Sequence, residues 1–138
     1  GSMCELPCFL PLRAGSLGKR NHIIIKGGQK IVKRYGMVIR VKPEKLEEYK
    51  KLHAHPWEGV LKTIKECHIQ NYSIFYHDGY LFSYFEYTGD NYEEDMKKMA
   101  ADPVTQEWWS LCKPCQEPLP SRKEGEWWAE MEEVFHLD

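Results

Sequence analysis

The chain has 138 residues, enough for one domain with a sizeable hydrophobic core. Its net charge of −2 gives no electrostatic reason to bind nucleic acid or an anionic membrane surface, so neither is expected as a partner. The sequence also lacks the apolar run of about 20 residues that a membrane-spanning helix requires.

Residues 1–32 differ in character from the rest of the chain. They begin with Gly1-Ser2-Met3, which is typical of a cleavage scar followed by an initiator methionine. Proline and glycine are frequent in this segment, and hydrophobic residues show little periodicity. We interpret residues 1–32 as a tag scar and an extension, and expect one folded domain over residues 33–138.

The first predicted elements are a strand and an interrupted helix. Hydrophobic residues alternate from Tyr35 to Val41, which predicts a half-buried strand. Pro43 can begin a helix, and glutamates follow it near the positive end of the helix dipole. The helical pattern is interrupted near Pro56 and resumes over residues 57–67.

A hairpin and two further helices follow. Strands are predicted near residues 69–77 and 80–87, because Asp78-Gly79 between them is a strong two-residue turn signal. A short amphipathic helix is expected around residues 92–99. Asp102 can cap a second helix that has Pro103 at its first position. The segment EEVFHL at 132–137 is predicted to form a final strand.

The order of these elements is β-α-β-β-α-β, which predicts an α+β, ferredoxin-like fold. Such a fold has one antiparallel sheet with helices on one face only. The other face must be covered, and pairing with a second copy of the chain would cover it. We therefore expect a homodimer.

Tyr49 and His53 are the leading candidates for chemistry. They are four residues apart near the end of the predicted helix, so their side chains lie on one face. An imidazole can both give and take a proton near neutral pH, and a phenol beside it can bind a substrate oxygen. A histidine that only caps the helix end, and a tyrosine that belongs to the core, are the alternatives.

Two pairs of adjacent indoles, Trp108-Trp109 and Trp127-Trp128, are the next candidates. Neighbours on a helix point about 100° apart, so one ring of a pair can join the core while the other reaches a pocket. Flat indole faces suit the apolar C–H face of a sugar. Packing in the core or at a dimer interface is the alternative interpretation.

The sequence gives little reason to expect a metal, a cofactor or a reactive cysteine. The histidines other than His53 and His55 lie on separate predicted elements, and no glycine-rich phosphate loop occurs. Cys112 and Cys115 have the spacing of a redox dithiol, but Cys112 lies at the C-terminal end of its predicted helix, where the dipole disfavours a thiolate. The five cysteines are unevenly placed, which favours a reducing compartment and hence a cytoplasmic location.

Four segments resemble the L-rhamnose mutarotases in their order and spacing. They are EEYKKLHAHPWEGV (47–60), NYSIFY (71–76), DPVTQEWW (102–109) and MEEVFHLD (131–138). The resemblance extends over residues 33–138. It implies a dimeric α+β barrel and an isomerase that interconverts the α and β anomers of L-rhamnose or a related sugar without a cofactor.

The resemblance also implies a role for individual residues. His53 corresponds to the proton donor of the family, and Tyr49 and Tyr72 to tyrosines that contact the sugar. Trp108 and Trp109 would form the wall on which the sugar stacks. The chain has His55 where members of the family often have asparagine, so the preferred sugar could differ.

Two alternative functions remain at this stage. The same dimeric barrel is used by cofactor-free monooxygenases and by haem-degrading enzymes, and fold alone does not distinguish them. A sugar-binding module without catalytic activity is the other alternative.

Overall fold

The computed structural model describes residues 32–138, so the scar and all but the last residue of the extension expected over 1–32 lie outside the described residues. The described elements follow in the order β1 (Lys33–Val41), η1 (Pro43–Lys45), α1 (Leu46–Ala54), α2 (Glu58–Glu66), β2 (Ile69–His77), β3 (Tyr80–Tyr87), α3 (Tyr92–Ala101), α4 (Pro103–Cys112), η2 (Lys113–Cys115), β4 (Gln116–Glu117) and β5 (Ala129–Met131).

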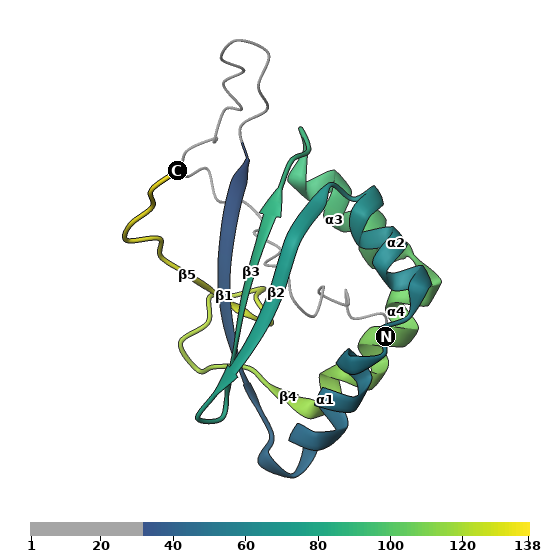
Figure 1. Ribbon diagram of the computed structural model, residues 1–138, viewed down its shortest axis with the longest axis vertical. Helices are drawn as coiled ribbons and strands as arrows, with labels where there is room; N and C mark the ends of the chain where they lie inside the picture. Colours follow the sequence, from purple (N-terminus) through teal and green to yellow (C-terminus); the bar gives the residue numbers. More distant parts are fainter. Residues whose placement is uncertain (1–31) are drawn as a thin grey trace.

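The strands form one antiparallel sheet. β1 lies between β3 and the short strands β4 and β5, and β2 is paired with the other edge of β3. The four α-helices lie along one side of this curved sheet, and no helix of the described residues covers the other side, which we call the open face (Figure 1). This arrangement confirms the predicted α+β class and the β-α-β-β-α-β order, to which β4 is a two-residue addition.

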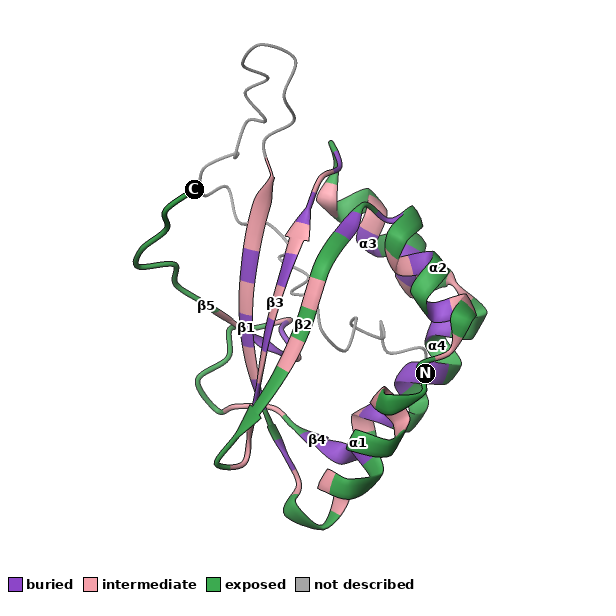
Figure 2. Ribbon diagram, viewed as in Figure 1, coloured by how far each residue is buried: buried purple, intermediate pink, exposed green. Residues whose placement is uncertain are grey.

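Alternation along the central strands determines which side chains enter the core. β1 and β3 are paired from Lys33 opposite Tyr87 to Arg40 opposite Tyr80. The odd-numbered side chains from position 35 onward in β1 and throughout β3, among them Met37 and Phe85, are buried against the helices. Buried residues accordingly gather between the sheet and the helices (Figure 2).

The predicted turn and helix cap are both confirmed. Asp78 and Gly79 have φ angles of 49° and 85°, the left-handed values that a tight hairpin turn requires. Asp102 Oδ2 accepts hydrogen bonds from the main-chain nitrogen of Thr105 at 2.9 Å and from the hydroxyl of Thr63 at 3.1 Å. The cap therefore also joins α4 to α2.

β2 contains a β-bulge that the sequence analysis did not predict. Asn71 and Tyr72 together oppose Phe85, since Gln70 is paired with Glu86 and Ser73 with Tyr84. Asn71 has a φ angle of 48°, a left-handed value that asparagine tolerates better than most residues. The extra residue turns the Tyr72 side chain toward the helices, where its ring stacks on Phe85 at 5.7 Å.

The final strand was predicted too far along the chain. β5 comprises Ala129–Met131, and residues 132–138 form no strand. Pairing with β1 ends where Met131 meets Gly36, and beyond this point Val134, Phe135 and Leu137 are exposed. The apolar pattern of the tail predicted a strand, but a strand also needs main-chain pairing, and the tail pairs with β1 only as far as Met131. Beyond this point Arg34 of β1 reaches Glu133 through a side-chain hydrogen bond at 2.7 Å instead.

Helices in the described part of the chain are all too short or too polar to cross a lipid bilayer.

Candidate active site

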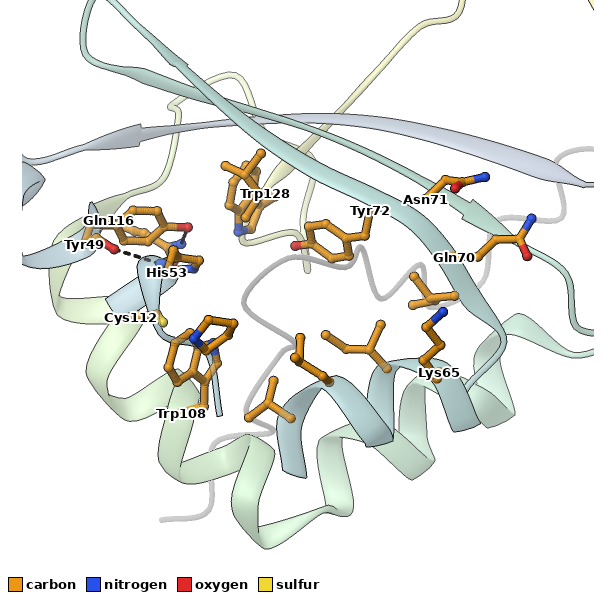
Figure 3. A pocket seen from close by; sticks show the side chains of 16 residues that line it. Tyr49, His53, Lys65, Gln70, Asn71, Tyr72, Trp108, Cys112, Gln116 and Trp128 are labelled. Atoms are coloured by element: carbon orange, nitrogen blue, oxygen red, sulfur yellow. Dashed lines mark hydrogen bonds between the residues drawn. The ribbon is translucent and has the colours of Figure 1, made fainter. Parts of the chain in front are cut away.

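A cavity of about 480 Å³ lies between the helix side of the sheet and the helices. Its wall contains side chains from α1, α2, α4 and β2, and from the segments around β4 and before β5. Four of the five side chains predicted to bind or transform a substrate meet here: Tyr49, His53, Tyr72 and Trp108 (Figure 3).

Helix α1 holds Tyr49 and His53 together because they are one helical turn apart. Their rings stack with centroids 4.0 Å apart and planes inclined by 26°. The helix ends at Ala54, and Pro56 follows shortly after, which disfavours helical geometry at His55. His53 therefore lies in the last turn, where its ring can face the cavity.

A hydrogen bond determines which nitrogen of His53 is available. Nδ1 lies 2.8 Å from the main-chain carbonyl oxygen of Tyr49. A carbonyl oxygen can only accept, so in the neutral ring the proton is on Nδ1 and Nε2 carries the lone pair. Among the described residues, none forms a hydrogen bond with Nε2.

Burial lowers the pKa of His53 below its ordinary value of 6.5. The hydrogen bond to the Tyr49 carbonyl acts in the opposite direction but is the smaller effect. His53 is therefore neutral at neutral pH, and its Nε2 can act first as a base.

Gln116 is a polar residue of the site that the sequence analysis missed. It is buried, and its Nε2 donates to the hydroxyl oxygen of Tyr49 at 3.3 Å. The Trp127 indole donates to Oε1 of the same amide at 2.8 Å. Because an indole N–H is only a donor, it fixes the amide with its NH₂ group toward Tyr49. A single glutamine outside any periodic segment carries no sequence signal for such a role.

Trp108 forms an aromatic wall next to the imidazole. Its ring packs edge-on against His53 at 5.3 Å and against Trp57 at 5.2 Å. Trp109, in contrast, is fully buried in the core and does not line the cavity. The adjacent indoles therefore separate as helical geometry requires, one toward the cavity and one away from it.

The second indole pair also reaches this region. Trp128 lines the cavity and is fully buried, whereas Trp127 lies behind Gln116. The sequence analysis singled out this pair but could not assign either ring to the pocket. His55 is exposed and lies outside the cavity lining.

The other candidate groups do not form a reactive site. Burial raises the pKa of the Cys112 thiol to about 12, and burial is also the largest cause of the raised pKa of Cys115, so both thiols are protonated at neutral pH. Within residues 32–138, no cluster of three or more His, Cys, Asp or Glu side chains could hold a metal ion.

Comparison with known proteins gives a consistent result. A family model described as L-rhamnose mutarotase matches residues 34–137. An L-rhamnose mutarotase of Oceanobacillus iheyensis is 33% identical over 109 residues, which are 78% of this chain and 100% of that protein. The corresponding Bacillus subtilis protein is 32% identical over the same shares of both chains. A UPF0734 protein of Dictyostelium discoideum is 33% identical over 69% of this chain and 80% of its own length.

Solved structures agree with the fold. A crystal structure of an L-rhamnose mutarotase from Formosa agariphila has a TM-score of 0.61 at 20% identity, covering 77% of this chain and 99% of that one. Tetracenomycin F2 cyclase from Streptomyces glaucescens, a polyketide cyclase, has a TM-score of 0.59 at 17% identity, covering 77% and 97%. At these identities the likeness concerns the fold alone.

Proposed function

Because the chain belongs to the L-rhamnose mutarotase family, we propose that it is an isomerase that interconverts the α and β anomers of L-rhamnose or a related sugar. One observation carries this proposal beyond family membership. A neutral imidazole, with its proton fixed on Nδ1, lines a cavity whose walls are aromatic rings and tyrosine hydroxyls. This arrangement suits proton transfer on a bound sugar.

Mutarotation needs two proton movements. When the ring opens, a proton leaves the anomeric hydroxyl while another arrives at the ring oxygen, and the aldehyde then turns about its C1–C2 bond before the ring closes again. In our proposal, Nε2 of His53 takes the proton of the anomeric hydroxyl. The imidazolium then returns this proton to the carbonyl oxygen on closure, so that His53 is the proton donor of the second half-reaction.

The two tyrosines would hold the sugar oxygens during these steps. The Tyr49 hydroxyl is oriented by Gln116, and Tyr72 approaches from β2 across the cavity. One of these hydroxyls, or a water molecule, would supply the proton for the ring oxygen. Because uncatalysed mutarotation is not very slow, positioning and modest acid–base help are sufficient.

Trp108 would supply the flat apolar wall for the C–H face of the sugar. It is next to His53, so a stacked sugar would present its edge to the imidazole. Trp109 lies behind this wall and would support it rather than touch the sugar.

We also propose that two copies of the chain pair through the open face of the sheet. The side chains of Phe75, Phe82 and Val38 follow one another across three strands on this face, and Phe75 is 63% exposed. A row of apolar side chains on an uncovered sheet face is typical of a subunit interface.

The first experiment measures exchange between the anomeric protons of L-rhamnose by one-dimensional NMR. Exchange should be faster with the wild-type protein than in buffer, and the His53→Ala variant should lose this acceleration. If the variant still accelerates exchange, the proposed function is supported but His53 is not the group that transfers the proton. No acceleration with L-rhamnose or with L-fucose would favour a sugar-binding module instead.

A further inference from the structure

Trp128 presents an unused hydrogen-bond donor to the cavity. Its side chain is fully buried, and its Nε1 is buried without a hydrogen-bond partner among the described residues. Trp128 is also part of the cavity lining, and the nitrogen-bearing edge of its indole is turned toward the interior (Figure 3).

The residues on either side of Trp128 are held in place by hydrogen bonds, so the orientation of its indole is fixed. The Trp127 N–H is used inside the protein, since it donates to Gln116 at 2.8 Å. The next residue, Ala129, is paired with Val38 in the sheet. Trp128 is therefore held between two fixed positions, and its N–H faces the cavity because the local structure directs it there.

We propose that the indole N–H of Trp128 donates a hydrogen bond to a non-reacting hydroxyl oxygen of the bound sugar. This contact selects sugars that carry an oxygen at that position. The inference rests on the mutarotase function proposed above. An indole N–H can only donate, and a buried donor without an acceptor is unfavourable. A sugar hydroxyl can accept this hydrogen bond and still donate its own proton elsewhere.

The hydroxyl should lie away from the reacting centre. An indole neither loses nor takes up a proton at equilibrium near neutral pH, so it cannot act as an acid or a base as His53 does, and its contribution is to binding. A contact that is equally strong in the ground state and the transition state affects KM and leaves kcat nearly unchanged.

The test compares wild type with Trp128→Phe, and with a protein that carries 3-benzothienylalanine at position 128. The second replacement keeps the bicyclic shape and puts sulfur where the N–H was, so it tests the donor even if the Phe variant fails to fold. Anomer exchange is measured for L-rhamnose and its 2-deoxy, 3-deoxy and 4-deoxy derivatives.

Removal of the donor should raise KM for L-rhamnose by about tenfold, with little change in kcat. For the one derivative that lacks the contacted hydroxyl, the replacement should have no effect on KM. Trp127→Phe is the matched control, because it removes a donor used within the protein and should affect all four sugars by the same factor.

An unchanged KM for L-rhamnose, or an equal rise for all four sugars, would overturn the inference. If the wild-type protein does not accelerate exchange, the proposed function fails, and the same comparison is made with the Kd of each sugar from NMR titration. A selective loss of affinity would then still support the role of Trp128. Failure of the wild-type protein to bind any of the four sugars would overturn both proposals.

Discussion

The Nδ1–H of His53 donates to the main-chain carbonyl oxygen of Tyr49, 2.8 Å away and one helical turn earlier. The tautomer of the proposed catalytic base is therefore set by a main-chain carbonyl group of α1 and not by a carboxylate. Without an acidic partner, burial dominates, and the pKa of His53 falls below 6.5.

The pH dependence of the proposed reaction follows from this lowered pKa. The neutral ring is the form that accepts a proton, so kcat/KM should reach a plateau towards neutral pH and should fall to half of that plateau at a pH below 6.5. Anomer exchange measured against pH, with the buffer rate subtracted, gives the profile. A rate that rises on acidification through pH 6.5 would mean that the imidazolium, and not the imidazole, begins the reaction.

The two adjacent indoles of α4 should behave differently when they are replaced. Trp108→Leu should raise KM for the sugar by about tenfold or more, because the stacking wall is lost. Trp109→Phe should lower the free energy of unfolding by a few kcal/mol, as truncation of a fully buried ring does, with a smaller effect on KM. Anomer exchange and urea unfolding test both variants. Equal effects on KM would indicate that Trp109 also contacts the sugar.

Gln116 should matter for both stability and activity. Gln116→Leu removes the acceptor of the Trp127 N–H and the hydrogen bond that Gln116 donates to the Tyr49 hydroxyl, so we expect a loss of about 1–3 kcal/mol in unfolding free energy. The rate of anomer exchange should also fall, because the contact between Gln116 and the Tyr49 hydroxyl is lost. Gln106→Leu is the control, because it removes only an exposed hydrogen bond to the Ala100 carbonyl oxygen; it should lower the unfolding free energy by less than Gln116→Leu and should leave the rate of anomer exchange unchanged. Full activity in Gln116→Leu would argue against a role for this network.

Glu86 should stabilise the bulge in a pH-dependent manner. Its carboxylate accepts hydrogen bonds from Tyr84, Asn71 and Gln70, which lower its pKa below 4.5. A lowered carboxyl pKa contributes stability that is complete above pH 4.5 and is lost as the pH falls through the lower folded value.

The measurement compares wild type with Glu86→Gln by urea unfolding at several pH values. The wild-type protein should be the more stable at neutral pH, and the difference should shrink well below pH 4.5. A difference that stays constant with pH would show that the charge of Glu86 does not hold the bulge.

The proposed dimer predicts a variant that dissociates. Phe75→Lys places a charge in the apolar row of the open sheet face, so sedimentation velocity should show a shift from dimer to monomer. Leu111→Lys is the matched control, since Leu111 is 42% exposed on α4 in the helical layer. A dimer that persists in Phe75→Lys and dissociates in Leu111→Lys would place the interface on the helices.

Local signals in the sequence were sufficient for most of the fold. The alternation from Tyr35 to Val41, the Asp78-Gly79 turn and the Asp102 cap each act within a few residues, and each is observed. These features depend on backbone preferences and on burial of one face, both of which can be derived from residue types alone.

The parts that could not be predicted depend on distant neighbours. Gln116 and Trp128 lie in segments without periodicity, and only the pairing of β4 and β5 with β1 brings them to the cavity. The end of the final strand could not be predicted either, because the apolar pattern of residues 132–137 does not show that main-chain pairing with β1 stops at Met131. The sequence analysis placed Trp109 in the sugar wall through the resemblance to the family, and the structure puts its ring in the core.

The bulge in β2 gives the cavity a dependence on chain length. Three residues lie between Ile69 and Ser73, although the pairing with β3 has places for only two, and the bulge absorbs the third. Deletion of the extra residue Asn71 should therefore restore regular alternation and leave Tyr72 and Ile74 on the helix side. Without a bulge, a strand of the present length would turn both side chains to the open face. Libraries that aim to change the sugar preference can therefore vary residue types along β2, but they should not add residues to it or remove the capacity to bulge at Asn71.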